Sequence, residues 1–196
     1  MDSVELTPKA TEIANCAQAL LAVRGYNGFS YSDIAESVHI SKPSVHHHFP
    51  SKAVLVQTVV RRYREEARAG MAALARQVAD PLARLKAYTG YWDKCIRDAS
   101  SSFCVCAMLG SELAAIPAEV AQEVRGHFQD LQGWLASLLQ EGSRQGIFRF
   151  EGTAKAEAMA LMATVHGSML AARVYSDADM FTVPVRQVLR RLTGDT

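Results

Sequence analysis

The sequence predicts an all-α protein of about nine helices, and three observations lead to that prediction. Apolar residues recur at helical spacing along most of the chain. Two expected helices open with a capping residue followed by proline at the first helical position, at Thr7-Pro8 and at Asp80-Pro81. No segment of useful length alternates apolar and polar residues, so a β-sheet is not expected.

Composition is that of a globular protein large enough to bury a core. The chain has 196 residues, of which 49% are hydrophobic and 21% charged, with a net charge of +1. Its longest uncharged run, from Ala158 to Ala172, is shorter than the ~20 apolar residues of a membrane-spanning helix. Four cysteines and an acidic N-terminus without an apolar run predict a cytoplasmic protein that does not bind membranes.

Four helices are expected before the Asp80-Pro81 step, and each follows a Ser or Thr that can cap it. Ser30 with Asp33 three residues later is the pattern of a capping box. The fourth helix is long, because Leu55, Val59 and Tyr63 continue one apolar stripe. The expected spans are residues 8 to about 25, 30 to 38, 41 to 49, and 51 to about 79.

The rest of the chain is expected to form a helical bundle. A Ser-rich break at residues 100–102 separates the helix that begins at Pro81 from an apolar one. Pro117 begins the next helix, which ends before a loop at residues 142–152. The expected spans are residues 81 to about 99, 103 to about 115, 117 to about 142, 153 to 176, and 185 to 192.

Residues 29–52, FSYSDIAESVHISKPSVHHHFPSK, predict two short helices joined by a tight turn. Val45 and Phe49 would bury one face of the second helix. Its polar positions can all donate hydrogen bonds, and they are Lys42, Ser44, His46, His47 and His48. From Ser37 to Arg64 there is no Asp or Glu, while Lys42, Lys52, Arg61, Arg62 and Arg64 are cationic. Such a helix suits an anion, and DNA in the major groove is the expected one.

This region resembles the TetR/AcrR family of bacterial transcriptional regulators. The matching motifs are RGY at Arg24-Gly25-Tyr26, DIA at Asp33-Ile34-Ala35, and SKPSVHHHFPSKAVL at residues 41–55. The resemblance implies a DNA-binding domain at residues 7–67, with the helix-turn-helix motif at 29–48. It implies an effector-binding and dimerisation domain at residues 68–196. The function implied is that of a homodimeric repressor, not an enzyme, which a small molecule, an electrophile or an oxidant releases from its operator.

The expected DNA contacts lie in and around the second helix of the motif. The family usually has a phosphate-contacting Tyr where this chain has His46, and imidazole can also donate. With four histidines in or beside this helix, affinity is expected to rise as the pH falls from about 8 to 6. Base edges or nearby phosphates are assigned to Lys42, Ser44 and His46, and backbone phosphates to Ser30, Tyr31, Ser32, His48 and Lys52; Pro43 and His47 complete the expected interface.

The last two helices, at residues 153–176 and 185–192, are predicted to form a homodimer that binds a palindromic operator. The first of them is apolar nearly all round, so several of its sides must be covered. The alternative is a central helix of a monomer.

A small-molecule effector site is expected in the bundle, although core packing is the alternative for most of its residues. The stretch FCVCAMLGSELA resembles the sixth helix of family members that respond to electrophiles or oxidants. The alternative, favoured for its two thiols, is that they are small core residues. The predicted lining is Tyr88, Tyr91, Trp92, Cys104, Cys106, Met108, Phe128, Trp134, Met162 and His166.

Other functions find less support in the sequence. Consecutive His46, His47 and His48 project ~100° apart on a helix and cannot converge on one ion, and no known metal, cofactor or phosphate-loop motif is present. No metal, cofactor or catalytic residue is therefore expected. Two alternatives stay open: control of the regulator by a protein partner, and a thiol-dependent enzyme that pairs Cys104 or Cys106 with His127 or His166.

Overall fold

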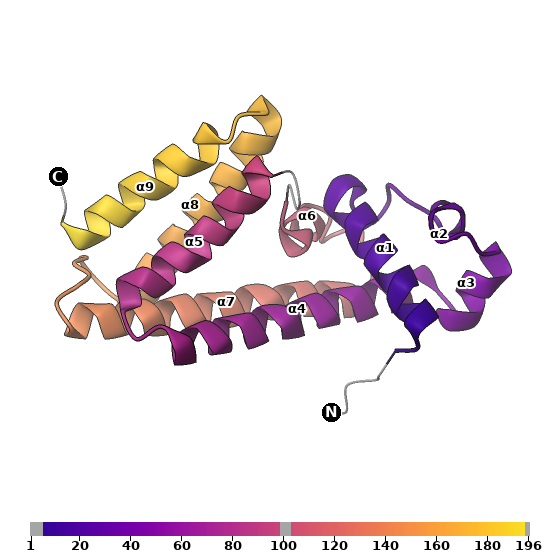
Figure 1. Ribbon diagram of the computed structural model, residues 1–196, viewed down its shortest axis with the longest axis horizontal. Helices are drawn as coiled ribbons and strands as arrows, with labels where there is room; N and C mark the ends of the chain where they lie inside the picture. The colour runs from indigo at the N-terminus through magenta and orange to yellow at the C-terminus, as the bar shows by residue number, and fades with distance from the viewer. Residues whose placement is uncertain (1–5, 99–102, 195–196) are drawn as a thin grey trace. The chain divides into compact units, whose positions relative to one another are not determined.

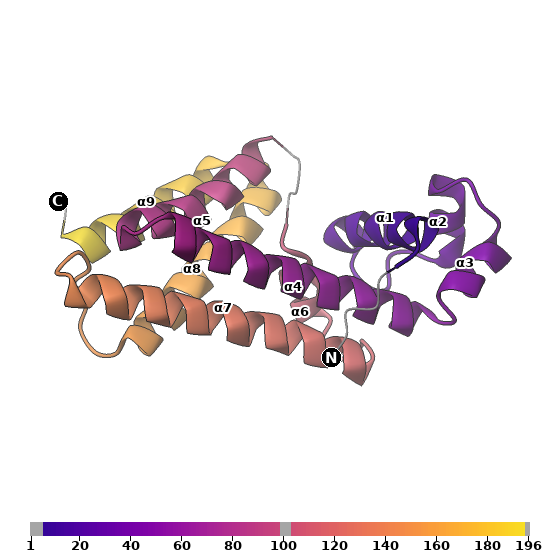
Figure 2. The ribbon, with the colours of Figure 1, turned by 60° about the horizontal axis from the view of Figure 1, so that its bottom comes forward.

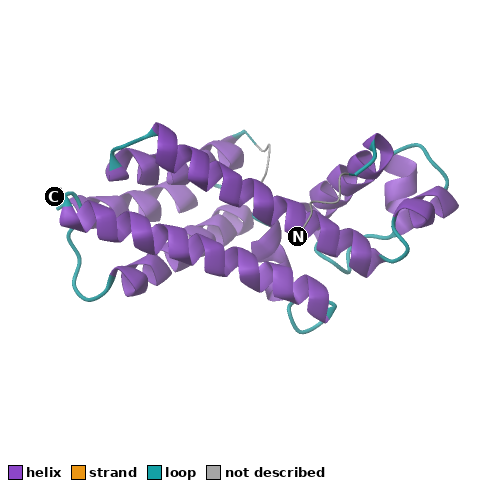
Figure 3. Cartoon of the chain, turned by 90° about the horizontal axis from the view of Figure 1, so that it is seen from below, coloured by secondary structure: helices purple, strands orange, loops and turns teal. Residues whose placement is uncertain are grey.

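The computed structural model describes residues 6–98 and 103–194, and these residues form nine helices and no strand (Figure 3). The all-α prediction is confirmed. The predicted Ser-rich break at residues 100–102 lies outside the described residues. In chain order the helices are α1 (Pro8–Arg24), α2 (Tyr31–Ser37), α3 (Lys42–His48), α4 (Lys52–Gln77), α5 (Pro81–Arg97), α6 (Val105–Ser111), α7 (Ala118–Arg144), α8 (Ala154–Tyr175) and α9 (Asp179–Thr193).

The chain divides into two compact units. The first contains residues 1–65 and 105–126, and the second contains residues 66–104 and 127–196. The sequence-based boundary near Ala67 falls within α4, beside the boundary between the units. The units are not contiguous in sequence, because α6 and the start of α7 group with the N-terminal helices.

Capping residues begin the helices of the first unit where the sequence predicts. The Thr7 hydroxyl accepts a hydrogen bond from the Ala10 amide at 3.3 Å, and the Ser41 hydroxyl accepts one from the Ser44 amide at 3.3 Å. Ser30 and Asp33 form the complete capping box at α2. The core of this unit is formed by buried apolar side chains of α1 to α4, among them Ile13, Leu21, Ile34, Val45, Leu55 and Val59.

In the second unit α8 and α9 pack along each other, with α5 beside them (Figures 1 and 2). Thr153 caps α8, because its hydroxyl accepts a hydrogen bond from the Ala156 amide at 3.1 Å. Glu157 of α8, which is buried, pairs with Arg191 of α9. The core of the unit includes Leu85, Leu135, Leu139, Leu161, Val165 and Phe181.

The last helix is longer than predicted, because it begins at Asp179 and not at Val185. The sequence-based start at Val185 rested on the apolar stripe that continues from there to Leu192. In the structure Pro184 lies on the exposed side of α9, and Phe181, one turn earlier, is buried in the core. Burial of Phe181 accounts for a helix that begins before the proline.

The helix α6 is shorter than the predicted span of 103 to 115. After Ser111 the chain continues in turns, in which the Glu112 amide donates to the Leu109 carbonyl at 3.1 Å. Helical geometry is disfavoured for the residue before Pro117, so a helix is not expected to continue through this position. None of the described helices is both long and apolar enough to cross a membrane.

Candidate nucleic-acid interface

A tight turn joins α2 to α3. The Val38 amide donates to the Ile34 carbonyl at 2.9 Å, and the Ile40 amide donates to the Ala35 carbonyl at 3.0 Å. Between them His39 has a φ of 54°, a left-handed conformation that is strained for a residue with a side chain. The turn therefore fixes where α3 begins relative to α2.

The helix α3 has one buried face and one exposed face. Val45, with Phe49 just after the helix, is buried against the unit's core. Lys42, Pro43, His46 and His47 are exposed, and Ser44 and His48 are half-buried. The exposed face carries hydrogen-bond donors and no carboxylate, which is the chemistry required to contact phosphates and base edges.

Tyr31 supports the motif from inside. Its side chain is buried, and its hydroxyl donates a hydrogen bond to the Phe49 carbonyl at 2.9 Å. Burial, with a smaller contribution from Tyr26, raises the pKa of Tyr31 to about 12. The His46 ring contacts the Tyr31 ring edge-on, with 4.6 Å between the ring centroids. Tyr31 thus positions α3, and its hydroxyl does not face outward as a phosphate donor would.

Lys52, at the start of α4, also has partners within the unit. Its ammonium donates to the Phe29 carbonyl and lies 4.2 Å from the Phe29 ring centroid and 4.8 Å from that of Tyr26. Burial lowers the pKa of Lys52, and the negative charges of Glu112 and Asp33 oppose that effect. The structure places this cation between the α1–α2 loop and α4.

Ser30 and Ser32 lie at the exposed start of α2. The Ser30 hydroxyl donates to Asp33 at 2.7 Å, and the Arg24 guanidinium pairs with the same carboxylate at 3.1 Å. Hydrogen bonds from Ser30, followed by that of Arg24, hold the pKa of Asp33 below its usual value. The capping box and Arg24 together hold the first turn of α2, which lies on the exposed side of the motif.

Two arginines of the acid-free segment 37–64 bond to side chains of neighbouring helices. Arg62 donates to the Asn15 side chain at 3.3 Å. Arg64 pairs with Glu123 of α7 at 3.2 Å, and both side chains are mostly covered. These residues connect α4 to α1 and α7, so the basic segment serves packing as well as charge.

The predicted effector residues are divided between the two units. Cys106 and Met108 belong to α6 in the first unit, and the other eight belong to the second. Within the second unit the structure brings together Tyr88 with Trp134, at 5.6 Å between ring centroids, and Phe128 with His166, at 5.1 Å. Tyr91 contacts the buried Trp92 but is itself 58% exposed.

Cys104 and His166 form a pair in the interior of the second unit. The buried Cys104 side chain hydrogen-bonds with His166, whose Nδ1 donates to the Met162 carbonyl at 2.8 Å. Burial lowers the pKa of His166, but the hydrogen bond and charge of Cys104, with the Met162 carbonyl, raise it above the ordinary value overall. Close by, the Tyr88 hydroxyl is buried without a hydrogen-bond partner of good geometry, and burial followed by the Cys104 charge raises its pKa.

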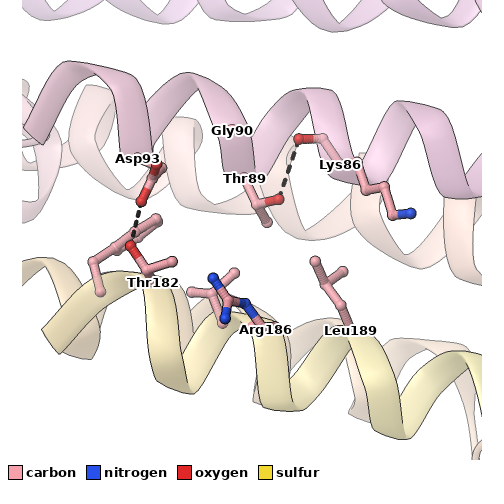
Figure 4. Close-up of a pocket in the computed structure, with 9 residues that line it drawn as sticks. Lys86, Thr89, Gly90, Asp93, Thr182, Arg186 and Leu189 are labelled. Atoms are coloured by element: carbon pink, nitrogen blue, oxygen red, sulfur yellow. Dashed lines mark hydrogen bonds between the residues drawn. The ribbon is translucent and has the colours of Figure 1, made fainter. Parts of the chain in front are cut away.

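A separate groove lies between α5 and α9, with a volume of about 190 Å³ (Figure 4). Thr182 donates a hydrogen bond to Asp93 across it. None of the predicted effector residues lines this groove, and its volume is below the ~300 Å³ of a typical ligand pocket. Its lining consists of Lys86, Thr89, Gly90, Asp93, Phe181, Thr182, Val185, Arg186 and Leu189.

Sequence reasoning missed Glu112, which contacts the loop between α1 and α2. Its carboxylate accepts a hydrogen bond from the Tyr26 amide at 2.6 Å. The sequence marks Glu112 as the only charged residue between Asp98 and Glu119, but it does not indicate which residues it contacts.

Over the described part of the chain, no cluster of three or more His, Cys, Asp or Glu residues could hold a metal ion.

A capped helix-turn-helix with an exposed donor face defines a DNA-binding transcriptional regulator. The family models agree along most of the chain. The model "Bacterial regulatory proteins, tetR family" matches residues 13–59, and "Tetracyclin repressor-like, C-terminal domain" matches residues 81–188. The chain belongs to the TetR family of transcriptional regulators. Members of this family bind DNA operators and small-molecule effectors and act as dimers.

Solved structures and a curated relative are similar to this chain. A TetR-family regulator from Agrobacterium tumefaciens is 50% identical, with a TM-score of 0.92 over 94% of this chain and 97% of that one. The reduced form of NemR from Escherichia coli is 17% identical and shares the fold, with a TM-score of 0.81 over 94% and 97% of the two chains. The transcriptional regulator UidR of Escherichia coli K12 is 34% identical over 63 residues, and the match spans only 32% of either chain.

Proposed function

We propose that the protein is a homodimeric repressor that binds a palindromic operator through α3 and is released by a small effector. The observation that carries the proposal is the exposed face of α3, which presents donors and no acid next to a buried Val45 and Phe49. Lys42, Ser44 and His46 are assigned to base edges or nearby phosphates.

Backbone phosphates are assigned to residues around α3. The candidates are Ser30 and Ser32 at the start of α2 and His48 in the last turn of α3, and the exposed Pro43 and His47 complete the interface. Tyr31 and Lys52 are assigned to positioning, because their polar atoms already bond the Phe49 and Phe29 carbonyls. Phosphate contacts set the orientation on DNA, whereas base contacts set the sequence.

The homodimer is assigned to the outer faces of α8 and α9. Large apolar side chains are exposed on both helices, and exposed apolar groups of this size mark an interaction surface. On α8 they are Met159, Leu170, Val174 and Tyr175, and on α9 they are Met180 and Val183. A twofold-symmetric dimer would present its α3 helices to half-sites ~34–36 Å apart, or a multiple of that spacing.

The dimer assignment is tested by mass in solution. The wild-type protein should elute near twice 21.4 kDa. Val174→Glu places a charge at a 70% exposed apolar position of α8 and should shift the protein toward the monomer. Val23→Glu, at a 57% exposed position of α1, is the matched control and should leave the dimer intact. A wild-type protein that is monomeric at micromolar concentration would refute the assignment.

The effector is assigned to the interior around Tyr88, Cys104 and His166. The buried Tyr88 hydroxyl, which has no hydrogen-bond partner of good geometry among the described residues, supplies a donor, and the Cys104–His166 pair supplies a thiol and a titratable ring. Aromatic side chains such as Phe128 lie beside them. A thiol paired with a histidine is more nucleophilic than a free one, which favours an electrophile as effector. An effector that prefers the conformation unable to bind DNA would weaken the free energy of DNA binding by ~1–3 kcal/mol.

Two experiments test the repressor proposal. Selection from a random duplex pool should enrich a palindrome, and enrichment of no sequence would contradict operator binding. N-ethylmaleimide, a thiol-reactive probe, should release the wild-type protein from that duplex and leave Cys104→Ser bound. Equal release of both proteins would refute Cys104 as the responsive group; Cys16→Ser, which removes a half-buried thiol of α1, is the control and should respond like the wild type.

A further inference from the structure

The residue after α6 joins the loop between α1 and α2 through one carboxylate. Glu112 accepts hydrogen bonds from the Tyr26 amide at 2.6 Å, from the Asn27 amide at 3.3 Å and from the Asn27 side-chain amide at 3.3 Å. All these atoms belong to the first unit. Three donors converging on one carboxylate make charge-assisted bonds, which are stronger than bonds between neutral groups.

The loop is shaped around that carboxylate. Gly25 has a φ of 72°, and a Cβ added there would come within 2.4 Å of the Glu112 carboxylate oxygen. A residue with a side chain at Gly25 would therefore be strained and would also displace Glu112. The glycine and the acid form one contact, although they are far apart in sequence.

The same loop leads directly into the DNA-binding motif. Tyr26, whose amide bonds Glu112, places its ring against the Lys52 ammonium. Lys52 in turn bonds the Phe29 carbonyl, one residue before the Ser30 cap of α2. The chain of contacts runs from Glu112 through the loop to the start of both α2 and α4.

We propose that Glu112 is a positioning residue for DNA binding: by holding residues 25–29, it keeps α2 and α3 in the geometry that fits the operator. The segment 105–126, which carries Glu112, is tied to the same unit a second time by Glu123 and Arg64. The proposal rests on the family's DNA binding and does not depend on the identity of the effector.

Replacing Glu112 removes both a negative charge and three hydrogen bonds, and these two losses are expected to change DNA affinity in opposite directions. Removing an acid from a DNA-binding unit lowers its repulsion of phosphates, so charge alone predicts tighter binding. Loss of the three hydrogen bonds frees the loop, so positioning predicts weaker binding. The sign of the change therefore separates the two explanations.

The test compares Glu112→Ala and Glu112→Gln with Glu65→Gln, which removes an exposed acid of α4 in the same unit. Each full-length variant is titrated with a duplex selected by the wild type, and with a scrambled duplex. We expect Glu112→Ala to bind the selected duplex about tenfold more weakly, as loss of charged hydrogen bonds implies. Glu112→Gln, which keeps an acceptor oxygen, should fall between it and the wild type. Glu65→Gln should bind as tightly as the wild type or slightly more so.

Hydrogen exchange of the Tyr26 and Asn27 amides gives a readout that does not require DNA. Exchange there should accelerate in Glu112→Ala while the buried amides of α4 stay protected, which separates positioning from unfolding. Equal or tighter operator binding by Glu112→Ala would overturn the proposal, and so would unchanged exchange at Tyr26 and Asn27. If the wild type selects no duplex, the proposed DNA binding is refuted. The exchange rates of the Tyr26 and Asn27 amides then test separately whether Glu112 holds the loop.

Discussion

Tyr31 of α2 donates its hydroxyl to the Phe49 carbonyl, which lies 2.9 Å away just beyond the end of α3. The bond is buried, and it spans the helix-turn-helix motif from its first helix to the residue after its second. The orientation of α3 therefore depends on a side chain that is itself hidden from DNA.

Tyr31→Phe should destabilise the protein by about 1–2 kcal/mol, because the buried Phe49 carbonyl loses its donor. Urea unfolding followed by circular dichroism measures the change. Ser32→Ala, which removes an exposed hydroxyl from the same helix, is the control and should change stability by less than about 0.5 kcal/mol. Equal stability of Tyr31→Phe and the wild type would show that the bond contributes nothing.

His39→Gly should stabilise the protein by about 1 kcal/mol, because glycine adopts the left-handed conformation of this turn without a Cβ clash. His39→Ala keeps the Cβ and removes the imidazole, so it should give no such gain. Thermal unfolding of the three proteins distinguishes conformational strain from loss of the histidine ring. A gain of the same size in both variants would assign the effect to the ring.

Local sequence patterns predicted most of the fold. The caps at Thr7, Ser30 and Ser41 act on amides two or three residues away, so a short window of sequence contains all that is needed to recognise them. The start of α9 was predicted too late, because the stripe from Val185 to Leu192 does not indicate that Phe181, one turn earlier, is also buried in the core.

The candidate site was less predictable, since it depends on contacts between distant segments. The exposed positions of α3 follow from helical spacing. Nothing local indicated that Tyr31 would bond Phe49, or that Lys52 would bond Phe29. The Glu112 contact joins residues 86 positions apart, and a single sequence gives no measure of such pairs.

Lys42→Ala should weaken binding to all duplexes by a similar factor and reduce the slope of log affinity against log salt by about 1, since Lys42 is an exposed cation at the start of α3. Fluorescence anisotropy across a salt series measures both quantities. Lys94→Ala removes an exposed cation of α5 in the other unit and should leave the slope unchanged. An unchanged slope for Lys42→Ala would remove this residue from the phosphate contacts.

The pKa of His166 predicts a dependence of stability on pH. Because the pKa is raised in the folded protein, protonation of His166 stabilises the fold. This contribution is fully present below the ordinary histidine pKa of about 6.5 and is lost as the pH rises through the higher folded value. The free energy of unfolding of the wild type, relative to His166→Gln, should therefore be larger at pH 6 than at pH 8. A difference that does not change with pH would contradict the assigned shift.

Operator binding through α3 is tested most directly by the affinity of the wild-type protein for the duplex selected from a random pool and for a scrambled duplex. Both affinities are measured by anisotropy over a range of salt. Specific recognition predicts affinity for the selected duplex at least ~10³-fold higher, together with a steep linear loss of log affinity with log salt. His46→Ala should reduce the ratio between the two duplexes. Equal affinity of the wild type for both duplexes at every salt concentration would contradict sequence recognition by α3.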